Sequence, residues 1–154
     1  MSLSLGSAIK AHLEHLSPGL GIDIWVRKPD EEVLPFLLIF DDINTSPDPA
    51  AAPGAVGGRK GVISEPQLSL WQAARGTAGP GGKRARAFDP VLPELVAAAL
   101  DGVRLRAAVT GFPARIYGCH LAYGPREIPS PVANNRVQHV IGLRIHRNLI
   151  TVRP

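Results

Sequence analysis

The sequence predicts an α+β domain, in which a mostly antiparallel β-sheet carries two α-helices packed on one face and is joined by long flexible loops. Several short segments alternate apolar and polar residues with a period of two, which is typical of strands. Two segments, residues 4–16 and 89–102, instead repeat apolar residues at helical spacing. The chain has 154 residues, 45% of them hydrophobic, which is enough for one core. We therefore expect a single domain over residues 1–154.

The first helix is expected at residues 4–16, where Leu5, Ile9 and Leu13 lie on one stripe. Two strands should follow. Residues 22–27 alternate and give one polar face, whereas residues 34–40 are apolar on both faces, as in a central strand.

Residues 65–102 are expected to organise the domain as a strand, a basic loop and a helix. In the strand, residues 67–73, leucines alternate with mostly polar residues. In the helix, Asp89 can act as the N-cap, the following proline fits the first helical position, and Gly102 can end the helix.

Glycine and proline concentrate in residues 47–61 and 76–82, which we interpret as flexible loops. Residues 57–61 resemble a phosphate-binding loop only in composition. They lack the required spacing, and a strand rather than a helix is expected after them, so nucleotide binding is rejected.

Three further strands are expected late in the chain, at residues 104–109, 114–123 and 137–146. Residues 124–135 contain several prolines and are interpreted as a stiff connection between the last two strands.

Residues that could carry chemistry are few. His12 and His15 are three apart on the first helix but have no third metal ligand, so they are expected to be solvated. Cys119, the one cysteine, is interpreted as a buried structural thiol. His120 and His139 are the best catalytic candidates, yet no nucleophile or carboxylate adjoins them in sequence. The sequence therefore predicts no enzyme activity, no cofactor and no metal.

Asp41 and Asp42 directly follow the apolar strand. Paired carboxylates in such a place can bind a metal or serve as acid and base, but no partner residue is evident. We therefore expect solvated acids at the end of a strand.

Charge is distributed unevenly along the chain. The net charge is +4, but residues 1–74 carry −4 and residues 104–154 carry +7. Such asymmetry indicates partners on oppositely charged surfaces, either a neighbouring copy of the chain or a nucleic acid. No secretory signal is expected, and the longest strongly apolar run, residues 33–40, is far shorter than the ~20 residues of a membrane helix.

Several features recur together in one family: the short N-terminal helix, the apolar strand at residues 35–40, Leu68-Ser-Leu-Trp-Gln followed by a loop and the helix 89–102, and an arginine-rich strand at residues 136–147. With them, the chain resembles the tail terminator (tail completion) proteins of long-tailed bacteriophages. Residues 47–61 and 76–82 look longer than that layout, which leaves the identity of the neck component open.

The resemblance implies a virion structural protein that forms a ring, usually of six copies, at the head-proximal end of the phage tail. The implied partners are further copies of the chain, the tail tube protein and a head–tail connector or stopper protein. DNA would pass through the ring without specific recognition, and no membrane is involved. The implied locations are the virion and, during assembly, the host cytoplasm.

Three other functions stay open: another neck or head-completion protein, a basic nucleic-acid-binding accessory protein, and a small enzyme. The candidate residues for contacts with a partner are basic, and we expect Arg144 and Arg147 to be exposed at the end of a strand. The full set is Arg75, Lys83, Arg84, Arg86, Arg136, Arg144 and Arg147.

Overall fold

A computed structural model of the protein describes residues 4–16, 19–30, 32–41, 45–47, 61–74, 88–103, 105, 112–129 and 136–148. Within this part of the chain, two helices and seven strands follow in the order α1 (Leu5–Glu14), β1 (Asp23–Val26), β2 (Phe36–Phe40), β3 (Thr45–Pro47), β4 (Gly61–Ser64), β5 (Gln67–Ala73), α2 (Leu92–Leu100), β6 (Ile116–Ile128) and β7 (Arg136–Asn148). The loops expected at residues 47–61 and 76–82 lie, apart from Pro47 and Gly61, outside the described residues.

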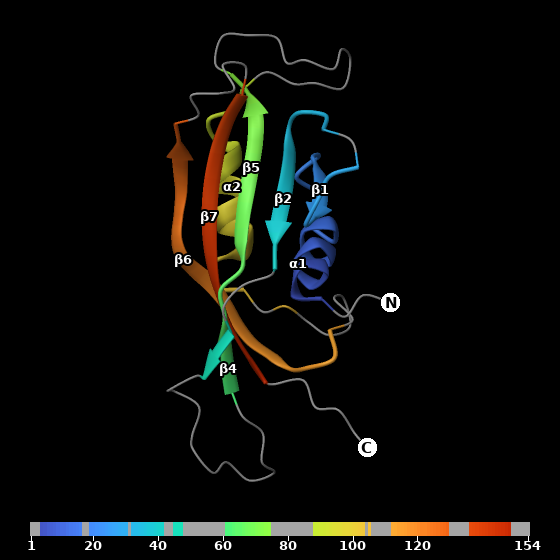
Figure 1. Ribbon diagram of the computed structural model, residues 1–154, viewed down its shortest axis with the longest axis vertical. Helices are drawn as coiled ribbons and strands as arrows, with labels where there is room; N and C mark the ends of the chain where they lie inside the picture. The colour runs from blue at the N-terminus through green and yellow to red at the C-terminus, as the bar shows by residue number, and fades with distance from the viewer. Residues whose placement is uncertain are drawn as a thin grey trace.

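The sheet is built around β7, which pairs with β6 along one edge and with β5 and β4 along the other (Figure 1). β4 and β5 keep one register on that edge, from Gly61 opposite Asn148 to Ala73 opposite Arg136. Between them, the Leu143 amide donates a hydrogen bond to the Pro66 carbonyl at 2.9 Å. The organising element is therefore β7 rather than the expected unit at residues 65–102.

The sheet continues from β5 to β2 and then to β1, while β3 pairs with β4. β1 and β2 run parallel, and every other strand pair in the described sheet is antiparallel.

Both helices cover the same face of this sheet. The core that they share takes buried side chains from the helices and from five strands, β1, β2, β5, β6 and β7, among them Ile9, Leu13, Val96, Leu100, Leu37, Leu68, Ile141 and Leu143. The two helices also touch directly, since His12 Nε2 donates to the Ala99 carbonyl at 3.2 Å. The expected α+β class, with two helices on one face of a mostly antiparallel sheet, is confirmed. His12 is therefore not the solvated residue expected from the sequence, whereas His15 is exposed.

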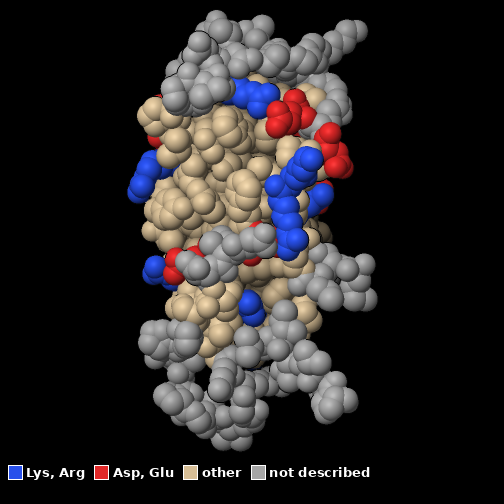
Figure 2. Space-filling model, viewed as in Figure 1, with Lys and Arg blue, Asp and Glu red and all other residues tan. Residues whose placement is uncertain are grey.

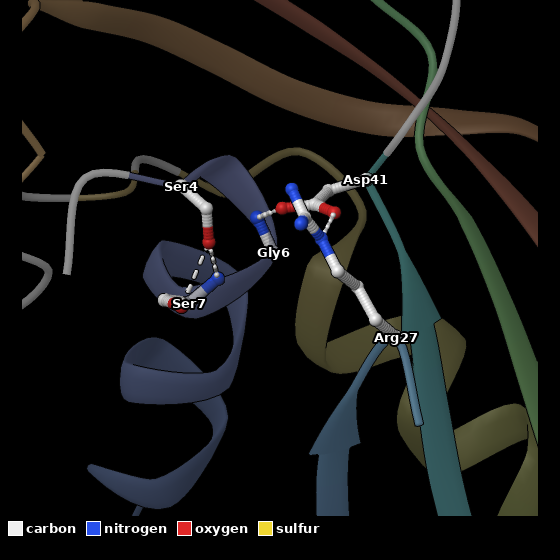
Figure 3. Close-up of polar contacts among 5 residues, drawn as sticks. All are labelled: Ser4, Gly6, Ser7, Arg27 and Asp41. Atoms are coloured by element: carbon white, nitrogen blue, oxygen red, sulfur yellow. Dashed lines mark hydrogen bonds and ion pairs between the residues drawn. The ribbon is translucent and has the colours of Figure 1, made fainter.

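The first turn of α1 is fixed by two oxygen acceptors (Figure 3). Ser4 caps the helix by accepting from the Ser7 amide at 3.1 Å. The Asp41 carboxylate accepts from the Gly6 amide at 3.2 Å and from Arg27 Nε at 3.1 Å. A carboxylate is favoured here because the helix dipole is positive at its N-terminus.

The expectation of a solvated Asp41 is thus wrong, because its side chain is only 3% exposed and ties α1 to the ends of β1 and β2. Asp42 lies outside the described residues.

α2 begins later than expected. The helix starts at Leu92, with Pro93 in its first turn, and Asp89 lies one turn earlier, where its carboxylate accepts from the Val91 amide at 2.9 Å. Gln72 of β5 holds this segment with two hydrogen bonds, one to the Asp89 carbonyl at 3.0 Å and one from the Asp89 amide at 2.9 Å. The helix ends before Gly102, which has the expected left-handed conformation.

β6 is longer than the sequence indicated, because it continues through Gly124 and Pro125 to Ile128. The stiff connection expected at residues 124–135 is therefore wrong for its first five residues. Register shifts flank this point, as in a β-bulge, and β6 lies at the edge of the sheet, where a proline need not donate to a neighbouring strand. Of the strand expected at residues 104–109, Leu105 alone is described.

Cys119 of β6 is buried, as expected, and burial followed by the charge of Asp101 raises the pKa of its thiol to about 12. No helix in the described part of the chain has the length and apolar content to span a membrane.

Candidate assembly surfaces

The sheet face opposite α1 and α2, here called the open face, is covered by no described helix. In Figure 1, α2 lies behind β5 and β7, so the open face is turned toward the viewer. Figure 2, in the same orientation, shows a broad uncharged area with Lys and Arg mostly toward its margins. On β7, Leu143 and Ile145 point into the core on the helix side. Because side chains alternate along a strand, the residues directly before and after each of them in the sequence point to the open face.

On the β1–β2 side, the open face has a small apolar cluster of its own. Leu34, Phe36, Leu38 and Ala73 are buried there, and two partly buried tryptophans pack against them, Trp25 and Trp71. β2 is therefore apolar on both faces, as the sequence predicted.

On the β6–β7 side, the open face changes character and becomes basic and aromatic. We call this part the β6 strip; it consists of Arg115, Tyr117, His120, Tyr123, Arg126, Arg144 and His146.

Stacked pairs order the β6 strip. The Arg126 guanidinium lies 5.3 Å from the centroid of the Tyr123 ring, and the Arg115 guanidinium lies 5.2 Å from that of Tyr117. Contacts of this kind fix long cationic side chains against an aromatic face. Nearby, the His120 and His146 rings stack at 5.1 Å. These stacking contacts hold the side chains of the strip in fixed positions, so the strip presents a surface of defined shape.

The position of Tyr123 depends on Gly142 of β7. A Cβ atom added to Gly142 would collide with the Tyr123 ring, so the ring occupies the space above this glycine. The main chain on β6 is equally constrained, because Gly124 has a φ of +99° and an added Cβ would meet the Val140 carbonyl at 2.6 Å. Tyr123 is still 40% exposed, so its ring presents a fixed apolar plane to solvent.

Two of the basic residues singled out from the sequence reach the open face. Arg136 forms an ion pair with Glu32 at 3.1 Å, and Arg144 forms one with Glu65 at 3.7 Å. The Arg144 side chain is 44% exposed, as expected.

Arg147 is not the exposed residue expected from the sequence. Its Nε donates to Ser64 Oγ at 3.1 Å, one terminal nitrogen donates to the Asn148 carbonyl at 3.0 Å, and the guanidinium lies 5.5 Å from the Phe112 ring centroid. Burial lowers the pKa of this guanidinium. The reason is that β7 continues past residue 146 and stays paired on both edges, so Arg147 is a structural residue. Replacement by Glu would disturb the fold.

The other basic candidates, Arg75, Lys83, Arg84 and Arg86, lie outside the described residues. Sequence reasoning missed the stacked pairs. It placed Tyr117 and Tyr123 in the strand expected at residues 114–123 but assigned Arg126 to the connection expected at residues 124–135. The sequence signal that could have indicated the pair is that Arg126 follows Tyr123 by three residues. Residues three apart lie on opposite faces of a regular strand, but the bulge between these two brings them onto the same face.

A second unusual surface lies on the opposite side of the molecule. Val91 is 50% exposed and Leu95 is 49% exposed, and Ala98 is exposed one turn further along α2. We call these three residues the α2 stripe. Their spacing places them in one row on the side of the helix that faces away from the sheet. Exposed apolar side chains that lie in one row can contribute to an interaction site.

Comparisons with known proteins bear on the fold. No protein-family model matches the chain, and no curated protein matches it either. Among solved structures, the chain is similar to one in the structure described as the virion of a native gene transfer agent (GTA) particle, with a TM-score of 0.58. The match covers 95% of this chain and 96% of that chain at 14% sequence identity. The protein therefore has a fold that also occurs in a component of that virion particle.

Proposed function

We propose that the protein is a virion structural protein that assembles into a ring at the head-proximal end of a phage tail. The observation that carries this proposal is the similarity to a chain of a gene transfer agent virion over nearly the whole of both chains. Because the two lengths match almost completely, the likeness involves the whole fold rather than a common substructure.

The surfaces of the protomer support self-association. A ring is built from heterologous contacts, in which one surface of a copy meets a different surface of the next. The β6 strip and the α2 stripe differ in chemistry and lie on opposite sides of the sheet. In this role the ring ends the tail tube and joins it to a head–tail connector or stopper protein, and DNA passes through it without specific recognition.

The proposed role is not enzymatic and requires no cofactor. The described residues contain no group of three or more His, Cys, Asp or Glu side chains arranged to hold a metal ion. Binding to other copies and to the tail tube is the activity we assign to the protein. Another neck or head-completion protein would also form ring contacts, and the order in which purified components associate separates these roles.

The test is the native mass of the purified chain over a wide range of concentrations, combined with electron microscopy of negatively stained particles. The expected result is a closed ring with one copy number, approximately six by the resemblance to tail terminators. A chain that stays monomeric at every concentration contradicts the ring, and so does one that forms open filaments.

A second candidate function, nucleic-acid binding, is favoured by the Arg–Tyr pairs of the β6 strip. Aromatic planes beside cations are how many proteins bind single strands. In that case, titration with single-stranded DNA would show saturable binding that weakens steeply with salt, and Arg126→Glu would abolish the binding.

A further inference from the structure

We propose that the α2 stripe of one copy docks onto the β6 strip of the next copy. The inference rests on the proposed ring and identifies the two surfaces that would meet in it.

The α2 stripe needs a partner that is apolar and basic. Its row of Val91, Leu95 and Ala98 leaves apolar surface in water. Residues 88–103 around it contain three acids, Asp89, Glu94 and Asp101, and no Lys or Arg. A surface that presents apolar contacts flanked by cations would complement it.

The β6 strip has these properties. Tyr117 is 50% exposed and Tyr123 is 40% exposed, which provides apolar area. Arg115 and Arg126 lie over the two rings and provide the cations. Together with tryptophan, tyrosine and arginine are enriched among the residues that contribute most to protein–protein binding.

The rigidity of the β6 strip also favours its assignment as the surface that binds the α2 stripe. The Tyr123 ring is already fixed over Gly142 before any partner binds, and Arg126 is already stacked on it. Binding therefore has little side-chain freedom left to remove at this point, which lowers the entropic cost of association.

The placement of the two surfaces determines how copies would join. α2 packs on β6 and β7 from one side, and the β6 strip lies on the other side of the same two strands. The stripe and the strip of one protomer are thus back to back and cannot meet within it. Each copy would give its stripe to one neighbour and its strip to the other. This is a head-to-tail arrangement, and it forms a ring when the rotation between successive copies closes.

A second copy of the chain explains both unusual surfaces of the protomer, whereas a nucleic acid explains the β6 strip alone. Nucleic acid on the β6 strip would leave Val91 and Leu95 exposed, because they lie on the other side of the sheet. The acids near these two residues disfavour a phosphate backbone on that side as well. A second copy covers both surfaces with one contact.

The experiment is cross-linking with a short bis-maleimide reagent in a mixture of two variants, Leu95→Cys and Arg126→Cys. Native Cys119 is buried, with a pKa of about 12, so it does not compete for the reagent. The expected result is cross-linked dimers in the mixture and none in either variant alone. Tyr117→Cys replaces Arg126→Cys if that variant folds poorly, and Glu14→Cys, at an exposed position on α1, is the matched control for Leu95→Cys.

Leu95→Asp gives an independent measurement. It places a charge in the centre of the stripe and should raise the dissociation constant between copies by about tenfold or more. Circular dichroism checks that the protomer stays folded. Glu14→Lys on α1 should leave the dissociation constant unchanged.

The outcomes separate this inference from the proposed function. A wild type that forms rings while the mixture gives no cross-link, or while one variant cross-links alone, overturns the assigned surfaces and leaves the ring intact. A wild type that stays monomeric at every concentration overturns the ring itself. Loss of DNA binding in Arg126→Glu with unchanged rings assigns the β6 strip to nucleic acid and overturns the docking.

Discussion

The two helices pack on the same sheet face, yet they present different surfaces to solvent. The partly or fully exposed positions of α1 include Ser7, Lys10 and Glu14, which water can satisfy. Those of α2 include Val91 and Leu95, which gain nothing from water. The difference indicates that α1 completes the protomer, whereas α2 has a second face suited to another molecule.

The largest expected effect is on the free energy of unfolding, when a buried side chain is truncated on the face of either helix that packs on the sheet. Here the two helices should behave alike. Leu13→Ala on α1 and Leu100→Ala on α2 each remove a fully buried side chain and should each lower the free energy of unfolding by about 2–5 kcal/mol. Urea denaturation of the monomer measures this. The matched control, Leu95→Ala, should change the monomer by less than about 0.5 kcal/mol. An equal loss in that control would show that Leu95 is covered within the protomer.

A smaller effect is expected where α1 is attached to the strands. Asp41→Asn removes the charge that accepts from the Gly6 amide and from Arg27, and should lower the free energy of unfolding by about 1–3 kcal/mol. Thermal denaturation monitored by circular dichroism measures the change. Asp30→Asn, at an exposed position, is the control and should be neutral.

The thiol beneath α2 provides a pH test of its packing. Folding raises the pKa of Cys119 to about 12, so the native state keeps a proton that the unfolded chain loses near the ordinary thiol pKa. This contribution to stability is complete below about pH 9, and it falls by up to about 1.4 kcal/mol per pH unit as the pH rises toward 12. Cys119→Ala should lose that part of the alkaline slope. Equal slopes in the two proteins would mean that the thiol is accessible to solvent when folded.

The smallest expected effect is on the association of copies, and it separates the contribution of charge to that contact from the contribution of apolar surface. Glu94→Lys should weaken association by only about 0.2–1 kcal/mol, and the difference from wild type should shrink as salt is added, because exposed charges are screened. Sedimentation equilibrium at low and high salt measures it. A loss as large as that of Leu95→Asp would mean that charge, not apolar surface, dominates the contact.

Local patterns in the sequence were sufficient to predict most of the elements. The period-two pattern at residues 67–73 matches β5 residue for residue, and the apolar stripe at residues 4–16 locates α1 to within two residues at each end. Helical spacing also located α2, although its first turn is displaced because Asp89 pairs with Gln72, a contact that only the folded chain creates.

Contacts between distant residues could not be predicted in the same way. Asp41 is 35 residues from Gly6, and nothing in its own neighbourhood marks it as a helix-capping acid. In the sequence, Arg147 lies near the end of the last expected strand and has no marker of burial. Its burial depends on β4, which pairs with this part of β7 and is distant in sequence. The β6 strip was missed because proline at position 125 suggested a loop, whereas a bulge in an edge strand accommodates it.

The central place of β7 has a consequence for how the chain reaches its native state. β4 and β5 lie side by side with β7 but precede it by some 60 to 90 residues, so much of the sheet depends on pairings that are distant in sequence. Contacts of that kind slow folding, because a long loop must close before they form. Until β7 has been synthesised, the backbone N–H and C=O groups along that edge of β5 have no partner strand. Truncation before residue 136 would therefore leave β5 with an unpaired edge and give an aggregation-prone product.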